Sequence, residues 1–162
     1  MLIRRANTDP LTGAPNRAGL ALAFAGSKNS AVTAVLIDMD HFKAVNDRHG
    51  HAAGDRLLVQ LVASIYKVLS RADVVARLGG DEFVVLFKDT QEADAIRHAE
   101  TLRCGFIEEI ATQSQLSVSA TLSIGIARPQ RQLIWITCSM PRTPPCIARK
   151  KVDGIASRCI AR

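Results

Sequence analysis

The hydrophobic pattern divides the first 127 residues into apolar strands and amphipathic helices. Compact apolar runs rich in β-branched residues predict strands at 31–38 and on both sides of Gly79-Gly80. Apolar and polar residues alternate over 117–127, which predicts another strand with one polar face. Apolar residues recur at helical spacing over 55–70 and 90–111. Strands interleaved with helices predict an α/β (α+β) domain, with a central sheet flanked by helices.

Capping and turn residues refine these elements. DPLTGAPNRAGLALAFAG is predicted to form a turn and a short helix, and HFKAVNDRHGHAAG a short helix and a loop. Asp55 is a candidate N-cap for the helix over 55–70, and Gly79-Gly80 suits a two-residue type I′ turn. The residues expected to form the apolar faces of the two long helices are Leu58, Leu61, Val62, Ile65 and Leu69, and then Ala93, Ile96, Ala99, Leu102, Phe106 and Ile110.

A sharp change of composition near Arg128 predicts a domain over 1–127 and a poorly structured basic tail over 128–162. The tail holds eight of the 21 Lys and Arg residues but one of the 15 acids, so the net charge of +6 falls to −1 for 1–127. Because the body is neutral, we do not expect nucleic-acid binding. Three of the four cysteines also lie in the tail, at spacings that fit no zinc pattern: Cys138, Cys146 and Cys159.

The chain shows no membrane or export signal. No apolar run approaches the roughly 20 residues of a membrane span, and MLIRRANTDP has no apolar core of a signal peptide. We therefore expect a cytoplasmic location, with any sensor module on another chain or missing.

Acidic residues at two strand ends suggest a cation site. Asp38 and Asp40 lie at the C-terminal end of the strand at 31–38, and they share one face unless the strand ends between them. Asp81 would join them if the hairpin lies beside that strand. Mg²⁺ is usually held by one or two carboxylates and the phosphates of a substrate. Lys43 lies one helical turn further on, where its ammonium group could meet a phosphate.

Asn46 and Asp55 could read a purine. A carboxylate accepts hydrogen bonds from N1–H and the exocyclic amine of guanine, and adenine lacks that pair of donors. A site built on this match would leave Asp55 unpaired with ATP. The alternative is that Asp55 acts as the helix N-cap. His49 and His51 have no acid or cysteine at zinc spacing, so both are predicted to be structural.

Four segments in this order, DPLTGAPNR, DMDHFKAVNDRHGHAAGD, RLGGDEF and TLSIGIA, resemble the GGDEF family of diguanylate cyclases over residues 7–127. The resemblance implies a fold like the palm of adenylate cyclases and polymerases. It also implies an enzyme that joins two GTP molecules into cyclic di-GMP and releases two pyrophosphates. The expected active form is a homodimer, with one GTP held by each of two domains that face each other.

The resemblance also implies roles for individual residues, while it leaves the general base open. Asp38, Asp81 and the carbonyl of Met39 would bind Mg²⁺ (or Mn²⁺). Asn46 and Asp55 would recognise guanine. Lys43, His41 and Phe42 are expected to bind the phosphates. Gly79 and Gly80 are expected to allow a close approach of the nucleotide. Glu82 is expected to assist the metal or the attacking hydroxyl.

The first departure from the family concerns product inhibition. Many members carry an RxxD site whose arginine lies nine residues before the first glycine of the motif. This chain has Asp73 in place, but Ser70 stands where the arginine would be, and Arg71 is one position away. We expect no conventional product inhibition.

The second departure is the tail. The family continues with a helix near "ADxALYxAK", a "GRNR"-like turn and a closing strand, and none of these is found after TLSIGIA. Reading shifted codons from Leu133 onward, with suitable synonyms, gives DMDYLLHAADAALYRAKKGRWHRVALYSA. We therefore hypothesise a one-base frame slip between about Ala127 and Leu133. If the chain is made as written, the final helix and strand are missing or altered. The alternative is therefore an impaired domain that only binds GTP.

Overall fold

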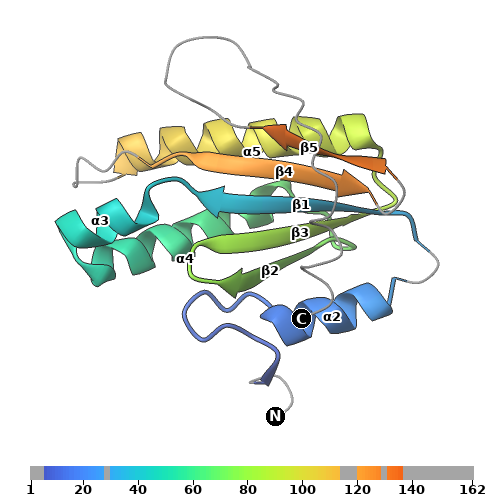
Figure 1. Cartoon of the computed structure of the whole chain (residues 1–162), viewed down its shortest axis with the longest axis horizontal. Helices are drawn as coiled ribbons and strands as arrows, with labels where there is room; N and C mark the ends of the chain where they lie inside the picture. The colour runs from blue at the N-terminus through green and yellow to red at the C-terminus, as the bar shows by residue number, and fades with distance from the viewer. Residues whose placement is uncertain (1–5, 28–29, 114–119, 129–130, 137–162) are drawn as a thin grey trace.

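Five strands form one antiparallel sheet in the order β2-β3-β1-β4-β5. The structure is a computed structural model that describes residues 6–27, 30–113, 120–128 and 131–136 of the 162-residue chain. Figure 1 shows β1 in the middle of the sheet, between β3 and β4. The strands are β1 (Val32–Met39), β2 (Val74–Gly79), β3 (Glu82–Lys88), β4 (Leu122–Arg128) and β5 (Arg131–Ile136).

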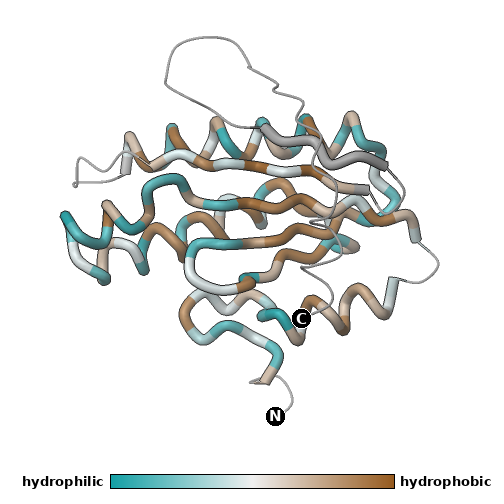
Figure 2. Tube along the Cα trace, viewed as in Figure 1, coloured by the Kyte–Doolittle hydropathy of each residue, from teal (hydrophilic) through white to brown (hydrophobic). Residues whose placement is uncertain are grey.

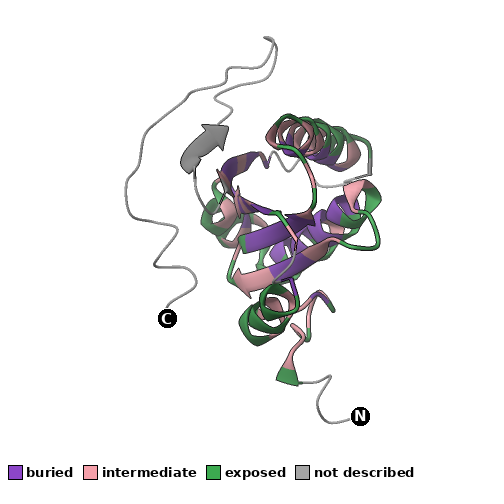
Figure 3. Ribbon diagram, turned by 90° about the vertical axis from the view of Figure 1, so that its right-hand side faces the viewer, coloured by how far each residue is buried: buried purple, intermediate pink, exposed green. Residues whose placement is uncertain are grey.

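Helices lie on both faces of the sheet. The two long helices, α4 and α5, pack against each other on one face, and α2 lies against β2 on the other (Figures 1 and 3). The short helix α3 joins the end of β1 to α4. The helices are α2 (Arg17–Ala25), α3 (Phe42–His49), α4 (His51–Val68) and α5 (Glu92–Gln113).

Alternation along β1 separates two apolar clusters. Val35, Ile37 and Met39 face the main core beneath α4 and α5. Val32 belongs to a smaller cluster on the opposite face, where Leu20 of α2 packs. Figure 2 shows apolar positions concentrated along the central strands. Since Asp38 has the same strand parity as Val32, it lies on the face opposite the main core.

The long helices are confirmed, but the predicted start of α4 is wrong. Gly50 is the N-cap of α4, so Asp55 lies inside the helix rather than at its cap. The predicted loop is reduced to this one glycine, whose φ of +80° ends α3 and lets α4 begin at once. The small residues Ala53 and Gly54 are buried in α4. Their lack of bulky apolar side chains made this turn of helix look like a loop.

The apolar face of α5 is rotated slightly from the prediction. Ala99, Leu102, Phe106 and Ile110 are buried as expected. Ala93 is exposed, and Ala95 is buried in its place. Small residues carry little hydrophobic signal, so only the packing decides which alanine faces inward.

The hairpin turn differs from the predicted type I′ turn. Gly79 pairs with Glu82, so the two loop residues are Gly80 and Asp81. A register shift between Arg77 and Gly79 adds one residue to β2 and moves the loop forward. Gly79 has φ +151° and Gly80 has φ +53°, whereas Asp81 is not among the residues with positive φ. A type I′ turn needs positive φ at both central positions, and that condition is not met.

The sheet continues past Arg128, where the composition changes. Strand β5, which was not predicted from the sequence, pairs with β4. The start of the strand predicted at 117–127 and all of 137–162, with Cys138, Cys146 and Cys159, lie outside the described residues. Within the described ranges, no helix is both long and apolar enough to cross a membrane.

Candidate functional site

Asp38 is the centre of the candidate site. Its neighbours across the sheet are Glu82 of β3 and Ser123 of β4. Asp81 immediately precedes Glu82 in the hairpin loop. Asp81 was expected to join Asp38 if the hairpin lies beside the first strand, and the pairing of β1 with β3 meets that condition.

The acids around Asp38 repel one another. Burial raises the pKa of the Asp38 carboxyl above its ordinary value, and the negative charges of Asp81, Glu82 and Asp40 raise it further. A bound cation would relieve this repulsion. Among the described residues no group of three or more His, Cys, Asp or Glu side chains is arranged to hold a metal. Mg²⁺ commonly takes one or two carboxylates plus substrate phosphates, so these acids fit a cation that arrives with a nucleotide.

The charged side chains of the domain that matter for the site fall into two groups, those engaged within the fold and those that are free. Asp9, Asp40 and Asp73 are engaged in hydrogen bonds within the fold. Others form no side-chain hydrogen bond or ion pair among the described residues, so they are available to a ligand. These are Asp38, Lys43, Asp55, Asp81 and Glu82.

The turn from β1 into α3 presents backbone N–H groups. Strand β1 ends at Met39, between the two aspartates of DMD, which settles the open question about their faces. His41 is the N-cap of α3, with a left-handed φ of +59° and no side-chain cap. The first backbone bond into this turn runs from the N–H of Val45 to the carbonyl of His41, at 3.2 Å. The N–H groups of 42–44 therefore lack helical partners, as at other anion-binding helix starts.

Asn46 and the segment around Asp55 are brought together by the contact of α3 with α4. A Cβ on Gly54 would collide with Oδ1 of Asn46, and it would lie 3.0 Å from Cζ of Phe42. Oδ1 of Asn46 is buried and has no hydrogen-bond partner. Asp55 follows Gly54 directly and is exposed. The helical turn that carries Asp55 thus lies against Asn46, and the ring of Phe42 packs against the same turn at Gly54.

The hairpin is tied to the N-terminal loop by Arg77. Its guanidinium contacts both carboxylate oxygens of Asp9 at 3.1 Å and the carbonyl of Gly80 at 2.7 Å. The backbone N–H of Arg77 also donates to the carbonyl of Pro15 at 2.8 Å. This link was not predicted from the sequence, although Asp9 lies in the segment DPLTG and Arg77 in RLGGDEF. Nothing in their spacing shows that they meet.

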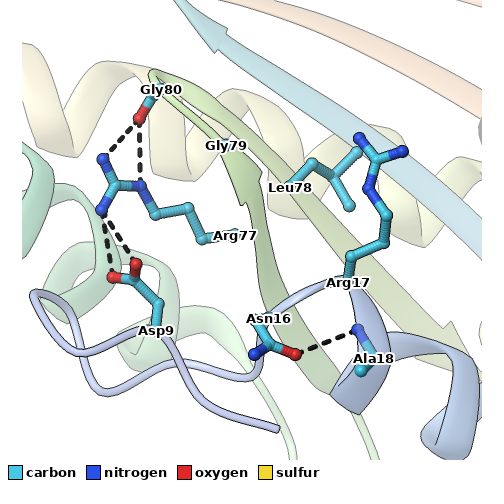
Figure 4. Close-up of a pocket in the computed structure, with 8 residues that line it drawn as sticks. All are labelled: Asp9, Asn16, Arg17, Ala18, Arg77, Leu78, Gly79 and Gly80. Carbon is cyan, nitrogen blue, oxygen red and sulfur yellow. Dashed lines mark hydrogen bonds and ion pairs between the residues drawn. The ribbon is translucent and has the colours of Figure 1, made fainter. Parts of the chain in front are cut away.

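Two hollows flank the hairpin. The larger, about 540 Å³, lies over the pair of Asp9 and Arg77 and contains none of the free acids (Figure 4). The smaller, about 280 Å³, borders Asp38, Glu82 and Ser123 and has the apolar side chains of Leu36 and Leu78 in its lining. We place the candidate site at the smaller hollow, because chemistry on phosphates needs the free carboxylates.

The position of the missing product-inhibition arginine is occupied by a local turn. Ser70 donates its backbone N–H and its hydroxyl to Oδ2 of Asp73, at 2.8 and 2.6 Å. Oδ1 of Asp73 accepts the backbone N–H of Lys88 at 2.9 Å. Asp73 therefore fastens the start of β2 to the end of β3.

Residues 6–133 match the family described as "Diguanylate cyclase, GGDEF domain". The diguanylate cyclase TpbB of Pseudomonas aeruginosa is 41% identical over 133 residues, which cover 78% of this chain and 31% of TpbB. The probable diguanylate cyclase DgcF of Escherichia coli K12 is 32% identical over 157 residues, 93% of this chain and 50% of DgcF. The chain thus spans about a third to a half of these relatives.

A solved structure shows the same fold. The diguanylate cyclase SiaD of Pseudomonas aeruginosa, crystallised with its activator SiaC, superposes with a TM-score of 0.68 at 32% identity. The superposition covers 77% of this chain and 50% of SiaD. The likeness supports a sheet flanked by helices, as the sequence pattern predicted.

Proposed function

This chain belongs to the GGDEF family of diguanylate cyclase domains, and from that premise we propose that it joins two GTP molecules into cyclic di-GMP in the cytoplasm. The observation that carries the proposal is the position of Asp38, whose free carboxylate lies beside Glu82 on the adjacent strand and near Asp81 in the hairpin loop. This arrangement crowds negative charge where a cation and phosphates would be stabilised. In a surface turn that binds no ligand, such repulsion would only be unfavourable.

The reaction is a phosphoryl transfer that occurs twice. The 3′-hydroxyl oxygen of one GTP attacks the α-phosphorus of the other, and the bond from that phosphorus to pyrophosphate breaks. The proton of the hydroxyl passes to a base, and repetition in the opposite direction closes the ring. Two nucleotides must face each other, so we propose that two copies of the domain form the active homodimer, each holding one GTP.

Asp38, Asp81 and the carbonyl of Met39 would hold Mg²⁺ (or Mn²⁺). The cation, when bound, neutralises charge on the attacking and leaving oxygens. Lys43 is exposed and free on the first turn of α3, where its ammonium group can pair with a phosphate. The uncapped N–H groups that follow His41 provide further donors for the triphosphate. Glu82 would assist the metal or the attacking hydroxyl, while Gly79 and Gly80 leave the hairpin without side chains next to the nucleotide.

The proposed guanine contacts are Asn46 and Asp55. The carboxylate of Asp55 accepts two donors from guanine and would find only one from adenine. The unpaired amide oxygen of Asn46 supports a ligand-binding role, because buried orphan acceptors are rare in structures that serve packing alone. Selectivity for GTP over ATP is therefore expected to depend on Asp55.

The experiment compares the purified chain with Asp81→Ala in the presence of GTP and Mg²⁺, and measures both pyrophosphate and cyclic di-GMP. We expect metal-dependent formation of both products by the wild type and their loss in the variant. Asp47→Ala is the control, because Asp47 is, like Asp81, an acid without a side-chain partner among the described residues, and it lies on α3 outside the candidate site. Equal product from wild type and Asp81→Ala would contradict the proposal.

A second candidate is a domain that binds GTP without turnover. It is favoured by the sequence of 137–162, which has none of the family segments whose Lys and Arg contact phosphates. It predicts GTP binding that depends on Asp55 and Lys43, with no pyrophosphate released at any Mg²⁺ or Mn²⁺ concentration.

A further inference from the structure

The carboxylate of Asp40 is hydrogen-bonded to residues at the start of β4, whereas the carboxylate of Asp38 has no partner among the described residues. Its carboxylate accepts the hydroxyl of Thr121 at 2.5 Å and the hydroxyl of Ser123 at 2.6 Å, one on each oxygen. Its backbone N–H donates to the carbonyl of Thr121 at 2.9 Å. Three hydrogen bonds therefore fix one residue of the turn that follows β1.

These bonds anchor a turn that would otherwise have little support. His41, the next residue, has φ +59°, a conformation that costs a non-glycine residue about 1 kcal/mol or more. No side chain caps the N-terminus of α3, so the direction of its free N–H groups depends on the packing of α3 against α4 and on the turn that precedes the helix. The attachment of Asp40 to β4 fixes the start of that turn.

The anchor also adjoins the proposed cation site. Ser123 is the neighbour of Asp38 across β1 and β4, and it lines the smaller hollow. One residue of β4 thus borders the proposed metal-binding carboxylate and holds the turn proposed to bind phosphate. Any movement of the turn away from β4 would change the distance between the two.

We propose that Asp40 is a positioning residue that aligns the first turn of α3 with the nucleotide triphosphate through Thr121 and Ser123, and that it is not a metal ligand. The proposal rests on the proposed function, since it takes GTP as the ligand of this turn. Asp40 acts through geometry, because both of its oxygens are already bonded to hydroxyl groups. Its charge is not the property on which the turn depends.

Asp40→Asn and Asp40→Ala separate geometry from charge. An amide can accept from one hydroxyl and donate to the other, because Ser and Thr hydroxyls act as donor or acceptor. Asp40→Asn therefore retains the anchor without its charge, whereas Asp40→Ala loses both. Asp47→Ala is the control, since Asp47 is an exposed acid of α3 with no hydrogen-bond partner among the described residues.

The dissociation constant of GTP is measured by calorimetry over a series of Mg²⁺ concentrations. Asp40→Ala is expected to raise it about tenfold or more, and Asp40→Asn and Asp47→Ala less than about threefold. The Mg²⁺ concentration for half-maximal binding should stay the same in Asp40→Asn, and the ratio of GTP to ATP affinity should stay the same in Asp40→Ala. Unchanged GTP affinity in Asp40→Ala would overturn the proposal. So would an Asp40→Asn variant as weak as Asp40→Ala with a raised Mg²⁺ requirement.

Amide hydrogen exchange without ligand provides a second readout. The N–H groups of residue 40 and Val45 should exchange faster in Asp40→Ala and at the wild-type rate in Asp40→Asn. Equal protection in both variants would show that the anchor does not hold the turn, whatever the fate of the catalytic proposal. If the wild type binds GTP but forms no cyclic di-GMP, the proposed activity fails and the binding data still decide the role of Asp40. A wild type that binds no GTP would overturn both.

Discussion

Arg77 and Asp9 are 68 residues apart in the sequence and form a shielded ion pair, with 13% and 16% of their side chains exposed. The same guanidinium holds the carbonyl of Gly80, so one side chain joins the N-terminal loop to the glycine turn of the candidate site. The fork geometry of arginine makes this possible, because separate nitrogens point at the two partners.

Replacing Arg77 by lysine should therefore weaken both the fold and the site. A lysine keeps the charge but cannot reach Asp9 and Gly80 together, so we expect the free energy of unfolding to fall by about 1–3 kcal/mol. GTP turnover should also fall. Arg103→Lys is the matched control, because the pair of Arg103 and Glu100 is similarly shielded at 12% and 22% but lies within α5. A loss of turnover in both variants would argue against a specific link to the hairpin.

Acid should destabilise the fold through Asp9. Burial raises the pKa of Asp9, but hydrogen bonds from Thr12 and Arg77 and the charge of Arg77 outweigh it and leave the pKa below its ordinary value. The unfolded chain therefore takes up the proton first as the pH falls. The stabilisation is complete above about pH 4–5, the range just above the unfolded pKa, and is lost as the pH falls through the lower pKa of the folded state. Urea unfolding of wild type and Asp9→Asn from pH 7 to pH 2.5 should show two curves that converge at the acid end.

Asp38→Asn should stabilise the metal-free protein at neutral pH. The raised pKa of Asp38 means that its charged form is disfavoured in the folded state, so stability declines as the pH rises through that pKa. Removing the charge should raise the free energy of unfolding by up to about 1 kcal/mol, a common trade of stability for function. Thermal unfolding with and without Mg²⁺ and GTP checks this: the ligands should stabilise the wild type and not the variant. A less stable metal-free variant would contradict the expected repulsion.

Gly54→Ala should disturb guanine binding. An alanine inside a helix normally stabilises it by up to about 1 kcal/mol relative to glycine. At Gly54 the new methyl group would displace the side chain of Asn46, so we expect little or no gain in stability and weaker GTP binding. Gly105→Ala in α5 is the control, because a Cβ there meets nothing within 4 Å. If both variants were equally stabilised and bound GTP like the wild type, the proposed placement of Asn46 would be wrong.

The DNA that encodes residues 127–162 should contain a second open frame. Read one base out of register from Leu133, it should encode a segment with ALYRAKK, as the resemblance leads us to expect. The family match ends at residue 133, whereas the alignment to DgcF covers 93% of the chain and so reaches into the tail. Sequencing this DNA decides the matter: a stop codon early in the shifted frame would refute the hypothesis.

Periodicity and turn chemistry were enough to place β1, β3 and the two long helices, because long apolar patterns reflect which face of an element is buried. Periodicity and turn chemistry were insufficient where glycine and alanine residues make the packing contacts. A single glycine, Gly50, stands where a loop was predicted, and Ala95 is buried on the face of α5 where Ala93 was predicted. The bulge before Gly79 moved the hairpin loop by one residue. Such details depend on packing and strand register, and small residues leave no hydrophobic pattern from which these can be predicted.

The sequence by itself determined the family, the order of the strands and helices as far as β4 and the identity of the candidate carboxylates, since each depends on local patterns and motifs. Only the tertiary structure decided which acids are free. Asp38 and Asp40 are two positions apart in one motif, yet one carboxylate is free and the other is bonded to Thr121 and Ser123, at the start of a strand more than 80 residues away. The physical reason is that a hydrogen bond requires its partners to meet in space, and residues distant in sequence meet only when the sheet has formed.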